Sequence, residues 1–176
     1  PAMQEVVTRS VDPDGGGVQD MTLFCFDSYG LFTTTVEAKV TPTGNGAGLT
    51  GNFEAEVPEN TRTVHFLANQ NMSEFKEDKF RNKSEAEVMA LLEGSSGRMI
   101  CWARFTCDPD NDSKIDAQMA DKGNTIKMIR NHAQVSIDNP INGWIEVTGF
   151  VAYNTNAFGT VAPYHPEKGF DFEWPG

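Results

Sequence analysis

The chain has 176 residues, of which 25 are acidic and 14 are basic, so its formal net charge is −11. A surface this acidic repels phosphate backbones and anionic membrane surfaces, which argues against nucleic acid as a partner. No apolar run approaches the ~20 residues that a membrane-spanning helix needs. The length suits one domain with a hydrophobic core, with room for a tail.

The N-terminal part of the chain predicts an exposed strand, a loop and a buried strand. An edge strand is expected within residues 1–9, in "MQEVVTR", and a flexible polar loop at 11–20. Residues 21–27, "MTLFCFD", carry apolar side chains at consecutive positions. Such a run is typical of a strand that is covered on both faces.

The next segments alternate between apolar and polar residues, which predicts strands with one buried face. In residues 32–40 one face carries Phe32, Thr34, Val36, Ala38 and Val40, and the other carries Thr33, Thr35, Glu37 and Lys39. A Gly-rich loop is predicted at 41–52, and two further strands at 53–57 and 62–69.

One segment predicts a helix instead of a strand. Ser84 and Glu87 match a capping box, in which the serine hydroxyl accepts from the Glu87 amide and the carboxylate reaches back. The apolar residues that follow, with Gly94 as a C-terminal stop, predict a short helix from about 85 to 93. Residues 73–82 are expected to form a helical turn or a loop.

Strand patterns resume in the second half of the chain. Segments 98–105 and 124–131 are predicted strands. Residues 133–153 predict a hairpin around Asn142-Gly143, a pair that tolerates the positive φ of a tight turn. His132 stands just before this hairpin, and we interpret it as a half-exposed histidine without a chemical role.

Together these patterns predict seven to nine strands and one or two short helices. Short strands divided by Gly, Pro and Asn turns indicate an all-β fold, either an antiparallel β-sandwich or a barrel. We expect this domain to span 1–153. Residues 154–176 are expected to be an irregular C-terminal extension, or a linker toward a second domain.

The most metal-like pattern is "DPDNDSKID", with carboxylates at Asp108, Asp110, Asp112 and Asp116. Carboxylates at alternate positions resemble the first half of a calcium loop. An EF-hand is excluded, because Ser113 stands where Gly is required and Met119 stands where the closing Glu belongs. A looser calcium site is the alternative to a solvated acidic turn, and no cofactor is expected.

Patterns for catalysis are missing, so we expect no enzyme activity. The chain has no GxSxG nucleophile elbow, and the triple glycine at 15–17 lacks the ending of a phosphate-binding loop. Four aromatic residues form a conceivable sugar-stacking platform, although the core is their more usual place. They are Trp102, Trp144, Trp174 and Tyr164, of which only the last two lie in segments expected to be exposed.

The cysteines are Cys25, Cys101 and Cys107, an odd number that excludes complete intramolecular pairing. Cys25 and Cys101 lie in apolar strand segments, where cysteine commonly acts as a small buried hydrophobic residue. We therefore expect structural thiols. A Cys101–Cys107 bridge is the alternative in an oxidising compartment, and the lack of a CxxC pair leaves a zinc site without support.

Four segments carry a family resemblance: "LFCFDSYGLF", "FEAEVPENTRTVHFLANQN", "MIRNHAQVSID" and "GFVAYNTNAFGTVAPYHP". Their sequence, order and separation resemble the fimbrillin family, the pilus and surface-adhesin subunits of Bacteroides-type bacteria. The resemblance runs through about residues 6–170. The "R-x-A-x-V" strand and the "Y-N…G-T-V-A-P" segment are its most specific parts.

The resemblance implies a transthyretin-like Greek-key sandwich that is usually followed by a second sandwich domain. It also implies a lipoprotein exported to the outer membrane, and since no lipidation cysteine stands before Pro1, we expect a processed or trimmed chain. In polymerising members an Arg-specific protease removes the first strand, which makes Arg9 the cleavage candidate. A strand from the neighbouring subunit then fills the groove.

We therefore expect a non-enzymatic structural or adhesive subunit of a bacterial cell-surface fimbria, or pilus, that joins other fimbrial subunits through strand exchange. The alternative is a non-polymerising surface module that binds a host protein or a glycan. Neither function needs nucleic acid. Contact with the membrane is expected only through a lipid anchor that lies outside this sequence.

Overall fold

The structure is a computed structural model of the chain. It describes residues 18–42, 51–70, 72–73, 75–92, 99–131, 159–165 and 167–170. The strand predicted within 1–9, the hairpin predicted at 133–153 and most of the C-terminal extension lie outside the described residues.

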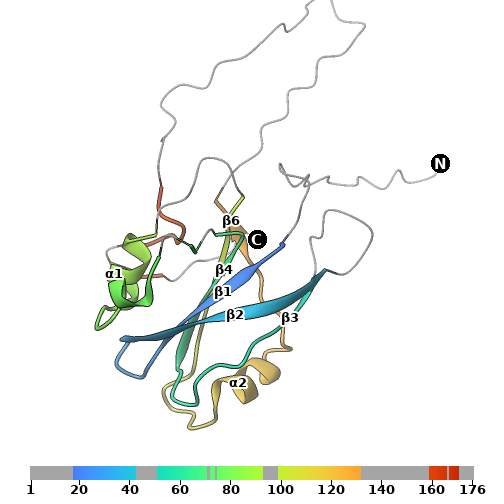
Figure 1. Ribbon diagram of the computed structural model, residues 1–176. Helices are drawn as coiled ribbons and strands as arrows, with labels where there is room; N and C mark the ends of the chain where they lie inside the picture. The colour runs from blue at the N-terminus through green and yellow to red at the C-terminus, as the bar shows by residue number, and fades with distance from the viewer. Residues whose placement is uncertain are drawn as a thin grey trace, which may run out of the picture.

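The described residues form an antiparallel sheet with short helices beside it (Figure 1). The strands are β1 (Met21–Phe26), β2 (Phe32–Pro42), β3 (Gly51–Glu54), β4 (Thr63–Ala68), β5 (Cys101–Thr106) and β6 (Ile129–Arg130). They lie in the order β3-β2-β1-β4-β5-β6. The helical segments are the 3-10 turn η1 (Glu77–Lys79), α1 (Glu85–Ala90) and α2 (Ile115–Asp121). The prediction of an antiparallel, mostly β fold is confirmed.

Both faces of the sheet are covered at its centre, where every residue of β1 and β4 is buried. Phe24 and Leu67 point to the side of α1, which we call the α1 face. Leu23 and Phe66 point to the side of α2, which we call the α2 face. The consecutive apolar residues of 21–27 correctly predicted a strand with two buried faces, because each face needs its own apolar set.

The predicted alternation of β2 is confirmed from Thr34 onward and is wrong at Phe32. The pairing of β1 with β2 shifts between Cys25, which lies opposite Thr34, and Phe26, which lies opposite Phe32. One extra residue in β2 turns Phe32 toward the α1 face, where its ring lies 5.9 Å from the ring of Phe26. A β-bulge of this kind changes the face of every residue on one side of it.

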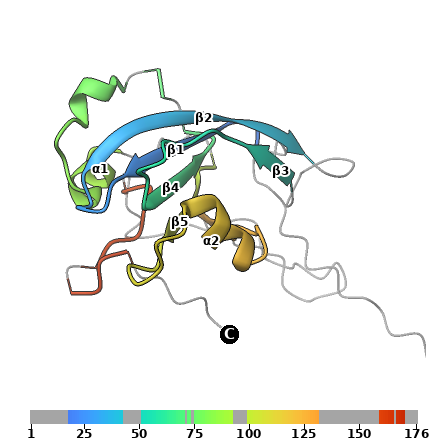
Figure 2. The same ribbon diagram turned by 90° about the horizontal axis from the view of Figure 1, so that it is seen from below.

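The sheet curls so strongly that β3 approaches β4, although β2 and β1 lie between them. In a flat sheet three strand spacings separate two such residues by about 14 Å. The rings of Phe53 on β3 and Phe66 on β4 are instead 5.6 Å apart. Figure 2 shows β2 and β3 arching over α2, so that the described sheet is a half-barrel.

The helix predictions were partly right. The capping box of α1 is present, with Ser84 accepting from the Glu87 amide while the Glu87 carboxylate accepts from the Ser84 amide. The helical turn expected within 73–82 is η1. The sequence did not predict α2, which begins after Lys114 without a side-chain cap. Its signal is the four-residue spacing of Ile115 and Met119, which both contact the α2-face core.

Several predicted strands are shorter than expected. Residues 55–57 continue the apolar alternation of β3 but leave the sheet ladder. The strand expected at 124–131 pairs with β5 only through Ile129 and Arg130. The described residues thus place one curled sheet between helical segments, while the two-layer sandwich with Greek-key order stays a prediction.

Candidate functional site

The α2 face is covered unevenly, and its outer part is the first candidate site. Leu23 and Phe66, on the central strands, are buried beneath α2 and the segment that follows it. On β2 and β3 the same face carries apolar side chains that are only half-buried. These are Val36, Ala38, Val40 and Phe53.

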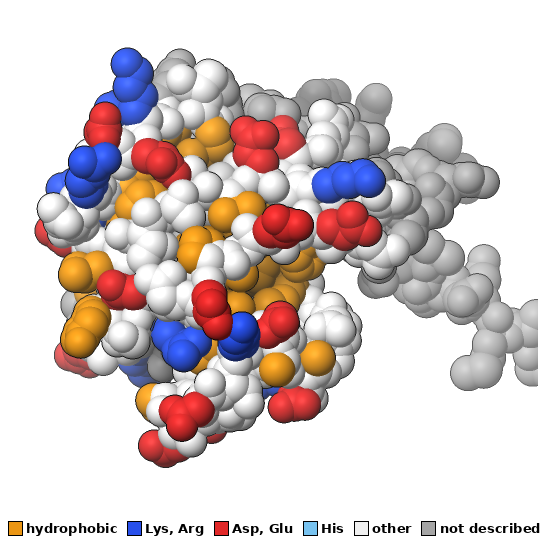
Figure 3. Space-filling model, turned by 60° about the horizontal axis from the view of Figure 1, so that its bottom comes forward, with side chains coloured by type: hydrophobic (Ala, Val, Ile, Leu, Met, Phe, Trp, Pro, Cys, Tyr) orange, Lys and Arg blue, Asp and Glu red, His pale blue; other side chains and the backbone are white. Residues whose placement is uncertain are grey.

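The space-filling view shows the hydrophobic surface that remains exposed on this side of the molecule (Figure 3). Hydrophobic side chains lie in a hollow of the surface, and comparison with Figure 2 places the hollow between β3 and α2. The opposite face of the same strands is polar, with Thr35 half-buried and Glu37 and Lys39 exposed. The apolar residues therefore belong to the inside of the curled sheet, and we call them, with Ala55 and Val57, the half-covered groove.

The groove lies beside a sheet edge. β3 pairs with β2 on one side, through Lys39–Pro42 and Gly51–Glu54. Within the part of the chain that the structure describes, no strand lies on the other side of β3. An edge of this type presents backbone amides and carbonyls in a row, next to apolar side chains that are partly exposed to water.

A second edge position is protected by a side chain. The Glu77 carboxylate, on η1, accepts from the backbone amide of Thr35 at 2.8 Å and from the hydroxyls of Thr34 and Thr35 at 2.8 and 2.9 Å. These hydrogen bonds lower the pKa of Glu77, with the amide of Thr35 contributing most. The carboxylate thus takes the place of a neighbouring strand where β2 extends beyond β3.

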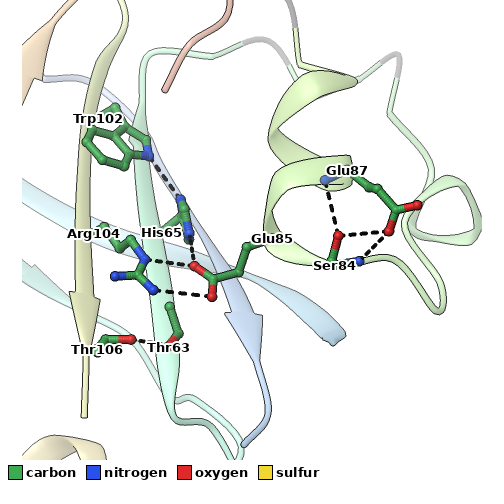
Figure 4. Close-up of polar contacts among 8 residues, drawn as sticks. All are labelled: Thr63, His65, Ser84, Glu85, Glu87, Trp102, Arg104 and Thr106. Atoms are coloured by element: carbon green, nitrogen blue, oxygen red, sulfur yellow. Dashed lines mark hydrogen bonds and ion pairs between the residues drawn. The ribbon is translucent and has the colours of Figure 1, made fainter. Parts of the chain in front are cut away.

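The most polar cluster in the described core lies on the α1 face (Figure 4). Trp102 Nε1 donates to His65 Nδ1 at 3.0 Å, and His65 Nε2 lies 2.8 Å from Glu85 Oε2. Because indole can only donate, Nδ1 must accept, so the proton is on Nε2 and points at Glu85. Arg104 completes the cluster by donating from Nε and Nη2 to the two oxygens of Glu85, at 2.7 and 3.2 Å.

The electrostatics of this cluster follow from its burial. His65 is fully buried, and burial lowers its pKa against the opposing effect of Glu85. Burial raises the pKa of Glu85, but the hydrogen bonds from His65 and Arg104 and the charge of Arg104 outweigh this effect and lower the pKa to about 2. The side chains therefore form a neutral histidine beside an ionised Glu85–Arg104 pair.

This arrangement suits a clamp better than a catalytic centre. Both nitrogens of His65 have partners within the protein, so the ring offers no nitrogen to a substrate. Phe170 packs edge to face against the His65 ring, with 4.8 Å between the ring centroids, and it also contacts Arg104. Glu85 is the first residue of α1, so the clamp fastens that helix to β4 and β5. No local pattern in the sequence marks this clamp, because its members lie far apart in the chain.

The acidic stretch proposed for calcium is a loop arranged around Gln118. The Gln118 Oε1 accepts from the Asp108 amide at 2.7 Å, and its Nε2 donates to the carbonyls of Asn111 and Ser113 at 3.0 and 2.9 Å. The four aspartates of this stretch are exposed to solvent: Asp108, Asp110, Asp112 and Asp116. In the described residues, no group of three or more His, Cys, Asp or Glu is arranged to hold a metal ion.

The other residues singled out from the sequence fall in three places. Arg9, His132, Trp144 and Trp174 lie outside the described residues. Trp102 is in the core, as predicted, and Tyr164 is 52% exposed with its ring 5.1 Å from that of Phe170.

The predicted structural thiols are confirmed, since Cys25, Cys101 and Cys107 are buried and not bridged. Cys101 begins β5 and Cys107 directly follows it, about 20 Å apart along an extended chain, too far for a disulfide.

No helix among the described residues is long and apolar enough to cross a membrane. Comparison of the sequence with models of known protein families found no match. The search of curated proteins and the search of solved structures likewise found no significantly similar chain.

Proposed function

We propose that this protein is a non-enzymatic structural or adhesive subunit of a bacterial surface fimbria, and that it joins its neighbours by accepting an extended strand. The observation that carries the proposal is the half-covered groove beside the outer edge of β3. The four segments that resemble fimbrillins support it from the sequence side.

Strand addition satisfies both features of this site at once. A donor strand can pair with the backbone of β3, and its alternate side chains can cover Val40 and Phe53, which are half-buried. The finer fold belongs to the same proposal: in a transthyretin-like Greek-key sandwich the curled sheet supplies one layer, and further strands cover the α2 face. Export to the cell surface with a lipid anchor, and cleavage after Arg9, are the corresponding steps of biogenesis.

The chemistry of the α1 face is consistent with a protein that does not turn over a substrate. Its one fully buried histidine has both nitrogens engaged inside the protein. Arg104 and Glu85 are likewise committed to each other through two hydrogen bonds. Groups that would serve as acid and base are thus used to fasten a helix to the sheet.

The proposal is tested with a synthetic strand. A fluorescently labelled peptide of about nine residues, alternating valine with threonine, is long enough to span 51–57. Fluorescence anisotropy with the full 176-residue chain should show saturable binding. Val40→Lys places a charge in the groove and should weaken binding at least tenfold. Lys39→Gln, on the opposite face of the same strand, should bind like the parent protein.

Two results would contradict strand addition at this site. One is the absence of binding up to high peptide concentration. The other is equal weakening by Val40→Lys and Lys39→Gln, since a groove on the α2 face must distinguish them. Circular dichroism of each variant confirms that the sheet is retained.

A glycan-binding module that does not polymerise is the second candidate. It is favoured by Tyr164, which is half-exposed and packs against Phe170 near the Arg104–Glu85 pair. An aromatic ring beside fixed polar groups offers the combination of apolar and polar contacts that ligand sites use. A glycan array should then give a signal that Tyr164→Ala abolishes, while an array without signal removes this candidate.

A further inference from the structure

We propose that the strand accepted by the half-covered groove is basic, with lysine or arginine at the positions that face away from the groove, and that it comes from a different polypeptide. This inference rests on the proposed function and specifies the partner of the same site. It is carried by the distribution of charge along the edge of the sheet.

The segment 51–57, which begins with the edge strand β3, has two chemically distinct sides. Phe53, Ala55 and Val57 are half-buried and contact the α2-face core. Glu54 and Glu56 alternate with them and are exposed. An added strand repeats this alternation, so every second residue of the partner must lie beside the two carboxylates.

The charges next to this edge make a basic partner the complementary one. On β2, Glu37 is exposed on the same side as Glu54, while Lys39 lies directly opposite Glu54. Lys39 offsets one carboxylate, which leaves an acidic excess along the border of the groove. Figure 3 shows acidic side chains bordering the hydrophobic hollow, with basic side chains beside them along one side. Opposite charges on neighbouring strands stabilise pairing, and like charges destabilise it.

A nearby acidic residue does not contribute to this excess. Glu59, two residues beyond the edge, forms an ion pair with Lys114 of 2.6 Å. The hydrogen bond from Lys114 lowers the pKa of Glu59. The acidic excess beside the groove therefore comes from Glu37, Glu54 and Glu56, and Lys39 offsets it in part.

The N-terminal segment of a second copy of this chain does not have the required chemistry. Residues 1–17 contain Glu5, Asp12 and Asp14 but only one basic side chain, Arg9. Placed beside Glu54 and Glu56, this segment adds like charge at the edge. Residues 1–17 are therefore not the complementary donor. We assign that role to an extended segment of another protein, in which apolar residues alternate with basic ones.

The test compares three peptides of about nine residues that alternate valine with lysine, with glutamate or with threonine, together with a peptide of residues 1–17. We expect the lysine peptide to bind the full chain about tenfold more tightly than the glutamate peptide. This difference should shrink at high salt, because the interacting charges are exposed.

A charge reversal in the protein gives the sharpest control. In the double variant Glu54→Lys and Glu56→Lys, the preference should invert, so that the glutamate peptide binds more tightly. The control variant Asp78→Lys and Glu167→Lys makes the same change in net charge at exposed residues outside this edge, and it should keep the preference of the parent.

The possible failures are distinguishable. Equal binding of the lysine, glutamate and threonine peptides would overturn the charge inference and leave strand addition standing. Binding of the 1–17 peptide as tight as that of the lysine peptide would also overturn it, in favour of self-assembly. If none of the alternating peptides binds, both this inference and strand addition at β3 are wrong.

Discussion

At the scale of single residues, His65 shows how a polar group is tolerated in the core. Its ring accepts from Trp102 and donates to Glu85, so every polar atom of the ring is satisfied. Replacing it by an apolar residue of similar size leaves a buried indole N–H without an acceptor, which is more costly than the loss of the hydrogen bond itself.

We expect His65→Phe to lower the free energy of unfolding by about 2 kcal/mol. His65→Gln should lower it less, because the glutamine amide can still donate toward Glu85. Urea unfolding followed by circular dichroism measures both. Equal losses for the two variants would mean that the contact with Glu85 contributes nothing to stability.

Gln118 is the residue that decides how the acidic loop behaves. Its Nε2 already donates to the carbonyls of Asn111 and Ser113, so these two oxygens do not need a cation as a partner. We expect millimolar calcium to leave the melting temperature unchanged. Gln118→Ala should lower the free energy of unfolding by about 1–2 kcal/mol. A calcium-dependent rise in the melting temperature of the parent protein would contradict this interpretation.

At the scale of elements, the limits of sequence-based prediction depend on which interactions are local. The strand β1 and the start of α1 were predictable, because consecutive apolar residues and the Ser84–Glu87 capping box are signals contained in a few neighbouring positions. The bulge that reorients Phe32 was not predictable from the sequence, because the pairing of β2 with β1 determines it. The clamp of His65 and Glu85 depends on tertiary contacts between elements 20 residues apart, which no local pattern encodes.

The capping box of α1 leads to a prediction at this scale. The helix has six residues, so its first turn is a large part of it. We expect Ser84→Ala to lower the free energy of unfolding by about 1 kcal/mol, and Ser84→Thr to have a much smaller effect. Hydrogen exchange at the Val88 amide, which donates to the Ser84 carbonyl, should speed up only in the alanine variant.

At the scale of the whole molecule, the two faces of the sheet serve different purposes. The α1 face is closed by α1, Phe80 and Phe170 around a buried aromatic core. On the α2 face the centre is covered, while the side chains of β2 and β3 are half-covered next to an edge. One face thus supplies stability, and the other supplies the surface from which we propose assembly.

The α1 face also links the stability of the whole fold to pH. Burial lowers the pKa of His65 from 6.5 in the folded state, and the pKa of Glu85 falls from 4.5 to about 2. In both cases the unfolded chain binds the proton first as the pH falls, so both groups reduce stability in acid. The contribution of His65 is lost as the pH drops below 6.5, and that of Glu85 between 4.5 and about 2.

We therefore expect the free energy of unfolding to decrease as the pH falls from about 7.5 to about 5, as measured by urea titration. In His65→Gln the free energy of unfolding should depend less on pH in this range. The steeper loss at lower pH, where Glu85 titrates, should remain. His165→Gln, which changes an exposed histidine, should behave like the parent protein. An unchanged slope in His65→Gln would show that other groups cause the acid sensitivity.

Because Glu85 begins α1, loss of the clamp in acid should be seen first as faster hydrogen exchange in that helix.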